Sequence, residues 1–485
     1  MLNRNRFKKL VPQSKEPEDD DTDNLSGKQA QQSTLLPKGR NYKVYWRHIL
    51  IWLCLWFMLI NYYERMVVKR VIKRCNWNRW ENWPKGAQPH RIGLFADPQI
   101  MDTYAYPNNT WITYQVSRFV IDNYHRRNWK FVQYYLDPDT NIFLGDLFDG
   151  GRIAKDEDWM DEYRRFNRLF PKIPSKKTIM SIPGNHDIGF GDEIIEDARK
   201  RFTAYYGESN DYIDIGNHTI VLLDTMSLSD HKNPEIKSIA QTFLDEFSQS
   251  YHPLPKILLS HVPLWRDPNQ LPCKGPGRES KKPFPIERGP QYQTVIDGYI
   301  TPEVLGKVQP EVIFCGDDHD YCHITQTYDV NGVVKTAEEY TVKSCAMNMG
   351  VQRPAIQLLS LHNPDATGPA QGKQTWQTEM CYLPDPKLPL ILYSVFFVLS
   401  VMWFLYMHFL PLSFNKNVAS KMGKATTDTI SSLPLPVSSS YGQSFLKTKY
   451  HVDEKPRRPF KNFLANYAIL ALFVCSIFTY FSATI

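Results

Sequence analysis

The sequence lacks several patterns that would indicate common alternative functions. None of its eight cysteines forms a C-x-x-C pair, so a zinc ribbon is not expected. No stretch interleaves basic and aromatic residues as a nucleic-acid groove does, although the net charge is +6. The first long apolar stretch starts too far from Met1, and has the wrong flanks, for a cleaved signal peptide. These absences argue against zinc-ribbon and nucleic-acid-binding proteins and favour an uncleaved signal anchor.

Three apolar stretches are long enough to cross a bilayer and are predicted as transmembrane helices: residues 44–63, 388–410 and 463–485. Residues 411–460 hold eight Lys or Arg against three Asp or Glu, so the positive-inside tendency predicts a basic cytosolic loop. Residues 1–43 hold few large apolar side chains, and we expect a disordered tail on the same cytosolic side. The domain between the first two spans is then expected in the lumen.

Linkers are expected at 64–90 and 362–387, on either side of that domain. The first is rich in tryptophan, because Trp77, Trp80 and Trp83 recur at a spacing of three. Their rings can lie at the membrane interface or cap the core of the following domain. The sequence leaves both interpretations open.

The cysteines and two sequons are compatible with a lumenal domain. Outside the apolar spans lie six cysteines, an even number that permits disulfides without defining their pairing: Cys75, Cys273, Cys315, Cys322, Cys345 and Cys381. Asn108 and Asn217 begin N-x-T triplets, which are acceptors for glycosylation in the secretory lumen.

Residues 91–361 alternate between strand-like and helix-like segments. Short apolar runs predict strands at 92–96, 141–144, 178–182, 219–223, 256–260 and 312–315. Apolar residues at helical spacing predict helices at 114–135, 156–170, 193–206 and 234–250. This alternation predicts a layered α/β domain whose strand-end loops carry the functional site.

Five of these predicted strands end in polar side chains. In chain order these are Asp97 with Gln99, Asp146, the run Asn185, His186 and Asp187, then His261, and finally Asp317, Asp318 and His319. Carboxylate, amide and imidazole groups are ligands of divalent cations. A carboxylate can also bridge two cations about 3.5–4 Å apart, the spacing used in phosphoester cleavage. The repeated pattern therefore predicts a metal site rather than a set of unrelated turns.

These motifs resemble those of the calcineurin-like metallophosphoesterases, whose pattern is D-x-H, GDxxD, GNH[DE], a lone His and GHxH. The resemblance covers roughly residues 91–361 and implies a four-layer αββα sandwich. It assigns one metal to Asp97, Gln99, Asp146 and His319, and a second to Asp146, Asn185, His261 and Asp317. It also implies that His186 acts on the leaving oxygen. Asp149 and Asp187 are expected to orient the metal ligands by hydrogen bonds without binding the metal themselves.

Gln99 and Asp317 stand where the family pattern has histidine. Each replaces an imidazole nitrogen with oxygen and remains a competent donor. Oxygen-rich ligation favours manganese or magnesium over zinc. We therefore expect two divalent metal ions, with manganese as the first candidate.

The variant motifs GDxxDGGR at 145–152 and GDDHDYC at 316–322, with the flanking spans, narrow the resemblance. They are similar to the fungal membrane-bound branch that remodels glycosylphosphatidylinositol (GPI) anchors in the endoplasmic reticulum or Golgi. That resemblance implies a phosphodiesterase that removes ethanolamine phosphate from a mannose of a GPI-anchored protein or GPI glycolipid. Two alternatives stay open: a non-catalytic adaptor for GPI-anchored cargo, and a phosphatase for another lipid- or sugar-linked phosphate.

Residues 265–293 lack regular periodicity and leave the sheet edge where a substrate would lie. The basic residues Lys281, Lys282 and Arg288 make this loop either a solvated surface or a contact for an anionic head group. Asp318, Asp320 and His323 follow the last motif closely, and we expect them to be solvated loop residues.

Overall fold

The computed structural model describes residues 43–108, 110–368, 373–409 and 459–484. The predicted tail at 1–43 and the predicted basic loop at 411–460 lie, apart from Lys43 and residues 459–460, outside the described residues. Residues 44–485 form one compact unit, which contains all the elements described below.

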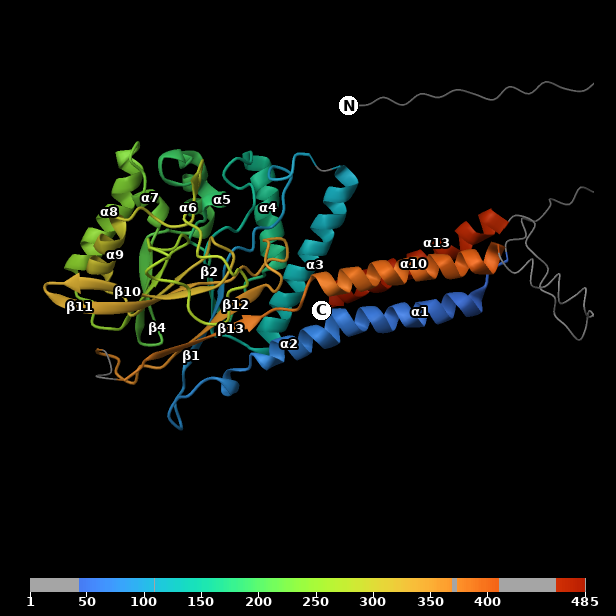
Figure 1. Ribbon diagram of the computed structural model, residues 1–485, viewed down its shortest axis with the longest axis horizontal. Helices are drawn as coiled ribbons and strands as arrows, with labels where there is room; N and C mark the ends of the chain where they lie inside the picture. Colours follow the sequence, from blue (N-terminus) through green and yellow to red (C-terminus); the bar gives the residue numbers. More distant parts are fainter. Residues whose placement is uncertain (1–42, 109, 369–372, 410–458, 485) are drawn as a thin grey trace, which may run out of the picture. The chain divides into compact units, whose positions relative to one another are not determined.

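Two β-sheets form the centre of the domain (Figure 1). The first has the order β13-β12-β1-β2-β3, with β1 at His90–Phe95, β2 at Thr140–Phe143, β3 at Lys177–Ile179, β12 at Ala355–Leu361 and β13 at Trp376–Tyr382. The second has the order β10-β11-β9-β6-β5-β4, with β4 at Asp211–Ile215, β5 at His218–Leu222, β6 at Lys256–Leu259, β9 at Val312–Cys315, β10 at Cys322–Val330 and β11 at Val333–Thr341. A short separate hairpin joins β7, Arg288–Gly289, to β8, Tyr292–Gln293.

The strands that carry the predicted site run parallel within each sheet. β1 pairs with β2 and β2 with β3 in parallel, and so do β5 with β6 and β6 with β9. Parallel strands place their carboxyl ends at one sheet edge, where functional loops gather. The polar residues that follow these strands therefore meet, although they are far apart in the sequence.

Alternating side chains of the strands fill two cores, one between the two sheets and one between a sheet and its covering helices. Ile92 and Leu94 of β1 pack with Leu259 and Phe314 of the other sheet, which joins the two sheets face to face. Phe95 points to the opposite face and contacts Trp129 of a covering helix. This alternation is the period-two burial of a strand that is covered on both faces.

Helices cover the outer faces of both sheets (Figure 1). They are α3 at Trp111–Tyr135, α4 at Asp156–Leu169, α5 at Asn185–Ile188, α6 at Glu196–Tyr206, α7 at Thr225–Leu228, α8 at Pro234–Gln249 and α9 at Ile300–Val308, with 3₁₀ turns η2 at Trp77–Arg79 and η3 at Gly191–Glu193. In α8, the Asn233 side chain accepts from the backbone N–H groups of residues 235 and 236, and Pro234 occupies the first turn. The result is the four-layer αββα sandwich that the resemblance of the motifs implied.

Within the part of the chain that the structure describes, three helices are long and apolar enough to cross a membrane. The first runs over Trp46–Arg74 as α1 at Trp46–Asn61, a π-helical turn η1 at Tyr62–Val67, and α2 at Val68–Arg74. The others are α10 at Lys387–Phe409 and α13 at Pro459–Thr484, and α13 packs against both α1 and α10. The first helix extends well past the predicted end at residue 63, because Val68 and Ile72 bury their side chains in the core of the domain.

Both predicted linkers contribute ordered structure to the domain. Trp77 is buried and donates its indole N–H to the carbonyl of Leu136 at 2.6 Å, so this ring caps the core. Within 362–387, β13 pairs antiparallel with β12 and forms an edge of the first sheet. Its alternation is weak because one face of an edge strand remains partly exposed, which explains why the apolar pattern did not predict it.

Two disulfides link distant parts of the chain. Cys75, which follows α2, is bonded to Cys381 of β13, and Cys273 is bonded to Cys322 at the start of β10. Cys315 and Cys345 are buried thiols with no disulfide partner among the described cysteines. The sequence permitted disulfides, and the fold selects these two pairs.

Candidate metal centre

Most of the predicted ligands lie in left-handed backbone turns directly after a strand. Their φ angles are 47° for Asp97, 32° for Gln99, 52° for Asp146, 70° for Asp317 and 61° for His319. Residues other than glycine seldom adopt positive φ, and such residues cluster at functional sites. The strained turns redirect each side chain from the strand axis toward the shared sheet edge.

Two glycines allow these turns to approach one another. A Cβ on Gly184 would lie 2.0 Å from Oδ1 of Asp146, and a Cβ on Gly145 would lie 2.5 Å from Nδ1 of His261. Any other residue would displace a predicted ligand. The glycines of the GDxxD and GNHD motifs are therefore required by packing of the site, in addition to the left-handed φ of 94° at Gly145.

The structure brings the ligands predicted from separate motifs into one buried cluster. Ligand atoms of Asp97, Asp146 and His261 all lie within 4.8 Å of one another. His261 Nε2 is 3.5 Å from Oδ1 of Asp146 and 3.7 Å from Oδ1 of Asp317. Gln99 joins the cluster by donating its Nε2 to Oδ2 of Asp146 at 2.7 Å.

Five buried donor atoms of this cluster have no hydrogen-bond partner among the described residues: Asp97 Oδ2, Gln99 Oε1, Asn185 Oδ1, His261 Nε2 and Asp317 Oδ2. A buried polar atom without a partner is costly, so native proteins seldom retain one without a function. All five are oxygen or imidazole donors of the kind that bind divalent cations. The residues therefore fit a metal centre of oxygen-rich composition.

The electrostatics of the cluster also favour bound cations. Burial, followed by repulsion from the carboxylate of Asp146, holds the pKa of Asp97 and of Asp317 well above the usual range. Burial alone would raise the pKa of Asp146 too, but His261 and His186 lower it. Burial also lowers the pKa of His319 to about 4, against the opposing effect of Asp146. Several buried carboxylates and neutral imidazoles thus face one another, and positive charge would relieve their repulsion.

Comparison with known proteins agrees with this geometry. The model of the calcineurin-like phosphoesterase family matches residues 90–321. Cell division control protein 1 of Saccharomyces cerevisiae is 54% identical over 450 residues, covering 90% of this chain and 91% of that protein. The chain belongs to the calcineurin-like phosphoesterase family.

More distant relatives share the domain and much of the chain. Metallophosphoesterase 1 of Danio rerio is 22% identical, over 68% of this chain and 84% of that protein. Metallophosphoesterase 1 of Gallus gallus is 24% identical, over 56% of this chain and 73% of that protein. Membership of the family supports a phosphoesterase role that uses divalent metal ions.

Histidine orientation in this phosphoesterase is set by backbone carbonyls. His261 Nδ1 donates to the carbonyl of Leu144 at 2.7 Å, so its Nε2 carries the lone pair that faces the carboxylates. His186 is half-buried, and its Nδ1 bonds the carbonyl of Asp149 and lies 3.3 Å from Oδ1 of the same residue. A carbonyl oxygen only accepts, so Nδ1 of His186 also carries a proton.

Asp187 positions two motifs of the phosphoesterase at once. Its carboxylate accepts from the backbone N–H groups of Leu147 and Phe148, at 3.1–3.2 Å, and from Gly184 at 2.9 Å. The GDxxD loop and the GNHD loop are thereby held together, which agrees with the orienting role predicted for Asp187. Burial, then the neighbouring Asp146, raises the pKa of Asp187 to about 7.

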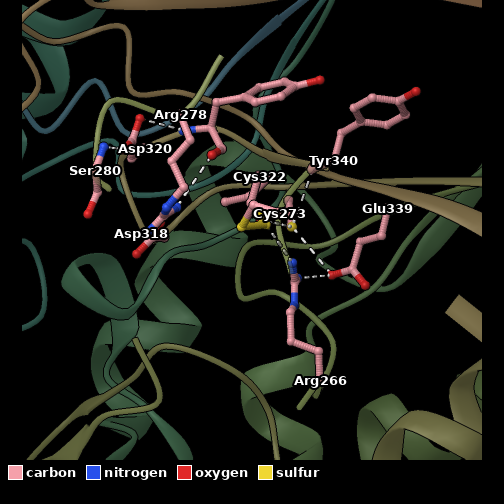
Figure 2. The surroundings of a disulfide bond; sticks show 12 residues. Arg266, Cys273, Arg278, Ser280, Asp318, Asp320, Cys322, Glu339 and Tyr340 are labelled. Carbon is pink, nitrogen blue, oxygen red and sulfur yellow. Dashed lines mark hydrogen bonds and ion pairs between the residues drawn. A yellow bond between two sulfur atoms is a disulfide. The ribbon is translucent and has the colours of Figure 1, made fainter. Parts of the chain in front are cut away.

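The residues that attach the 265–293 loop to the site were not predicted from the sequence. Asp318 accepts from Arg278 Nη1 at 2.7 Å, and Asp320 accepts from the backbone N–H groups of Glu279 and Ser280 (Figure 2). The prediction that Asp318, Asp320 and His323 are solvated was wrong, because two of them hold this loop and His323 pairs with Glu338 at 2.6 Å. Several charged residues follow the end of β9 closely, and this was the one pattern in the sequence that could have indicated these contacts.

The tip of the same loop reaches the metal centre. The backbone carbonyl of Gln291, between β7 and β8, accepts from Asn185 Nδ2 at 3.0 Å, which leaves Asn185 Oδ1 for the cluster. Nothing in the sequence marks Gln291, because the contact uses its backbone. Lys281 and Lys282 are exposed, and Arg288 is also exposed and lies 3.5 Å from Asp297.

Proposed function

We propose that this phosphoesterase is a membrane-bound phosphodiesterase that removes ethanolamine phosphate from a mannose of GPI anchors. The observation that carries the proposal is the buried cluster of unpartnered oxygen and imidazole donors, on a chain with three candidate membrane-spanning helices. Helices on both sides of the domain favour a substrate that is itself held in the membrane. The choice of substrate rests on the resemblance of the sequence motifs to the GPI-remodelling branch.

In the proposed centre, Asp97, Gln99, Asp146 and His319 hold one metal ion, and Asp146, Asn185, His261 and Asp317 hold the other. When bound, two divalent cations supply an activated water as nucleophile and neutralise charge that develops on the phosphoryl oxygens. The chain contributes the fixed orientation of each ligand, through the carbonyls of Leu144 and Gln291 and the carboxylate of Asp187. Fixed donors need no reorganisation during the reaction.

His186 is proposed to protonate the leaving oxygen of the sugar. Its Nδ1 proton is committed to Asp149, so the acidic form is the imidazolium with a second proton on Nε2. The carboxylate of Asp149, 3.3 Å from Nδ1, stabilises that cation. A positioned acid of this kind contributes roughly 10²–10⁴-fold to the rate when the leaving group is a basic alkoxide.

Manganese is the proposed metal, because Gln99 and Asp317 replace imidazole with oxygen donors. The test removes bound metal from the full chain and reloads it with manganese, magnesium or zinc. Highest activity with manganese or magnesium agrees with the oxygen-rich ligand set. Highest activity with zinc contradicts the proposal for the metal while leaving the phosphodiesterase proposal intact.

The domain is proposed to lie in the lumen of the endoplasmic reticulum or Golgi, and its partner is proposed to be a GPI-anchored protein or GPI glycolipid. Support comes from the two disulfides, since such bonds form and persist in oxidising compartments. Occupied sequons at Asn108 or Asn217, detected as a mobility shift after deglycosylation, would agree with this orientation.

The deciding experiment compares wild type with Asp146→Asn, using Asp211→Asn as a matched exposed control. Metal per chain and release of ethanolamine phosphate from a GPI glycan are measured on full-length protein in lipid nanodiscs. We expect about two metal ions and turnover in wild type and control, and loss of both in Asp146→Asn. Wild type that hydrolyses only other lipid- or sugar-linked phosphates indicates the phosphatase alternative. Anchor processing that survives Asp146→Asn in cells indicates the adaptor.

A further inference from the structure

The amino-terminal half of α3 exposes a stripe of large apolar side chains. Trp111 is 74% exposed, Ile112 69%, Val116 58% and Phe119 47%. In a helix these positions lie on one face, within an arc of about 140° at 100° per residue. Thr113, which lies outside that arc and about 60° beyond Val116, is polar. The stripe is therefore an organised apolar surface, which soluble domains seldom leave uncovered.

The stripe continues directly into contact with a candidate membrane-spanning helix. The Phe119 ring lies 5.7 Å from the ring of Phe478 in α13. One and two turns further along the same face, Asn123 donates to Glu64 at 3.1 Å and Arg126 donates to Ser482 at 2.6 Å. The same face of α3 thus packs on the helical bundle from Phe119 onward and is uncovered before it.

A buried charge pair fixes α3 against the bundle. Arg127 Nη1 lies 2.6 Å from Glu64 Oε2, and both side chains are 5% exposed. Tyr393 of α10 donates its hydroxyl to the second oxygen of Glu64 at 2.9 Å. A buried charge pair of this kind is costly to break, because separation leaves an uncompensated charge. Glu64, in the π-helical turn after α1, therefore links the first span to α3 and to α10.

Cationic and aromatic residues mark the level of a membrane surface at the same end of the bundle. Lys69 and Lys73 of the α1–α2 helix lie over the ring of Tyr135, the last residue of α3, at 5.7 and 4.8 Å. Arg70 and Arg74 next to them are exposed. Lysine, arginine and aromatic rings are favoured at the boundary between lipid tails and head groups.

We propose that residues 111–119 of α3 insert their apolar stripe into the head-group region of the same bilayer that α1, α10 and α13 cross. A bilayer is the occupant that fits, because the stripe is continuous with the contact to a candidate membrane-spanning helix, and exposed basic residues of α2, Arg70 and Arg74, can complement anionic lipid. This inference concerns membrane contact and does not depend on the proposed reaction.

Insertion would also set the height of the metal centre above the membrane. The loop from Asp97 to Thr110 connects two predicted ligands with the start of α3. Within it, Asp102 accepts from the backbone N–H of Gly150, beside the GDxxD motif. The contact of Asp102 with Gly150 therefore lies between the stripe and the site along the chain. Insertion of the stripe would hold the site close to lipid-linked substrates.

The test places spin labels on the full-length chain in lipid nanodiscs, in a Cys54→Ala, Cys475→Ala background. Labels at Ile112→Cys and Val116→Cys are compared with labels at Thr113→Cys, which lies outside the arc of the stripe, and at Tyr251→Cys, which is 88% exposed in a distant loop. Relaxation by oxygen, which partitions into lipid, and by a water-soluble nickel chelate reports the surroundings of each label.

We expect the ratio of oxygen to nickel accessibility to be several-fold higher at positions 112 and 116 than at positions 113 and 251. Equal ratios at all four positions would mean that the stripe faces water and would overturn the proposal. Low access to both reagents at 112 and 116 would mean that protein covers the stripe, which also overturns it. Because the side chains of Ile112 and Val116 are exposed, replacing either of them with labelled cysteine removes no core contact.

Discussion

His261 donates Nδ1–H to the carbonyl oxygen of Leu144 at 2.7 Å, and Leu144 directly follows β2, the strand that leads to Asp146. One hydrogen bond therefore fixes the tautomer of an imidazole from the second sheet against a loop of the first. This contact joins the two sheets at the point where their parallel strands end, and it leaves His261 Nε2 directed at the carboxylates.

His261→Ala is expected to remove one of two bound metal ions and to lower activity by at least about a hundredfold, since even supporting residues of metal sites contribute 10–100-fold. Metal per chain and turnover are the measurements. His252→Ala is the control, because that ring stacks on Phe247 away from the site. Full metal content in His261→Ala would show that this side chain is not a ligand.

Gly184→Ala is expected to abolish metal binding without unfolding the chain. The added Cβ would lie 2.0 Å from Oδ1 of Asp146, so the carboxylate must move. Gly306→Ala is the matched control, since no described heavy atom lies within 4 Å of a Cβ built there. Metal content and melting temperature together separate loss of the site from loss of the fold, and an unchanged metal content would refute the packing argument.

His186→Ala is expected to retain metal and to lose roughly 10²–10⁴-fold in turnover of substrates with alkoxide leaving groups. The loss should be far smaller for a p-nitrophenyl phosphodiester, because p-nitrophenolate leaves without a proton. Comparing the two substrate classes is the measurement. Equal losses for both would assign His186 a structural role instead of proton donation.

Replacement of Cys273 and Cys322 by serine is expected to destabilise the domain by about 2–4 kcal/mol, because the bond closes a long loop. The released 265–293 segment carries the Gln291 carbonyl that orients Asn185, so metal affinity should fall as well. Thermal unfolding and metal titration test both effects. Cys54→Ser is the control. Unchanged metal affinity in the double variant would show that the disulfide-held loop does not support the metal site.

Acid stability should depend on His218, which lies in β5 outside the metal centre. Burial lowers its pKa in the folded protein to about 4, from an ordinary value of 6.5. Between these values the unfolded state binds a proton that the folded state does not, so stability falls as pH decreases from 6.5 toward 4. The effect is about 2 kcal/mol at pH 5. His218→Asn should reduce the fall in melting temperature between pH 7 and pH 5. If the variant and wild type show the same fall, His218 is not the group responsible.

The candidate site could be located from the sequence because each of its motifs depends on neighbouring residues. Each of Asp97, Asp146, Asn185, His261 and Asp317 lies within three residues of the end of a short apolar run, and such runs predict buried strands without any knowledge of the fold. The six strands and four long helices predicted in the domain are present, with boundaries shifted by a few residues. Several elements were not predicted, including β4, β10, β11 and β12. The strand β13 and the helix α9 were also missed, since a partly exposed edge strand and a nine-residue helix have weak periodicity.

By itself, the sequence determined the order of the metal-ligand motifs, the α/β alternation and the three apolar spans, because each depends on neighbouring residues. Only the tertiary structure decided that Cys75 pairs with Cys381, that Asp318 binds Arg278, and that α3 leaves an apolar stripe beside α13. These relationships join residues far apart in the chain. Long-range proximity has no local pattern, since it follows from how whole sheets and helices pack against one another.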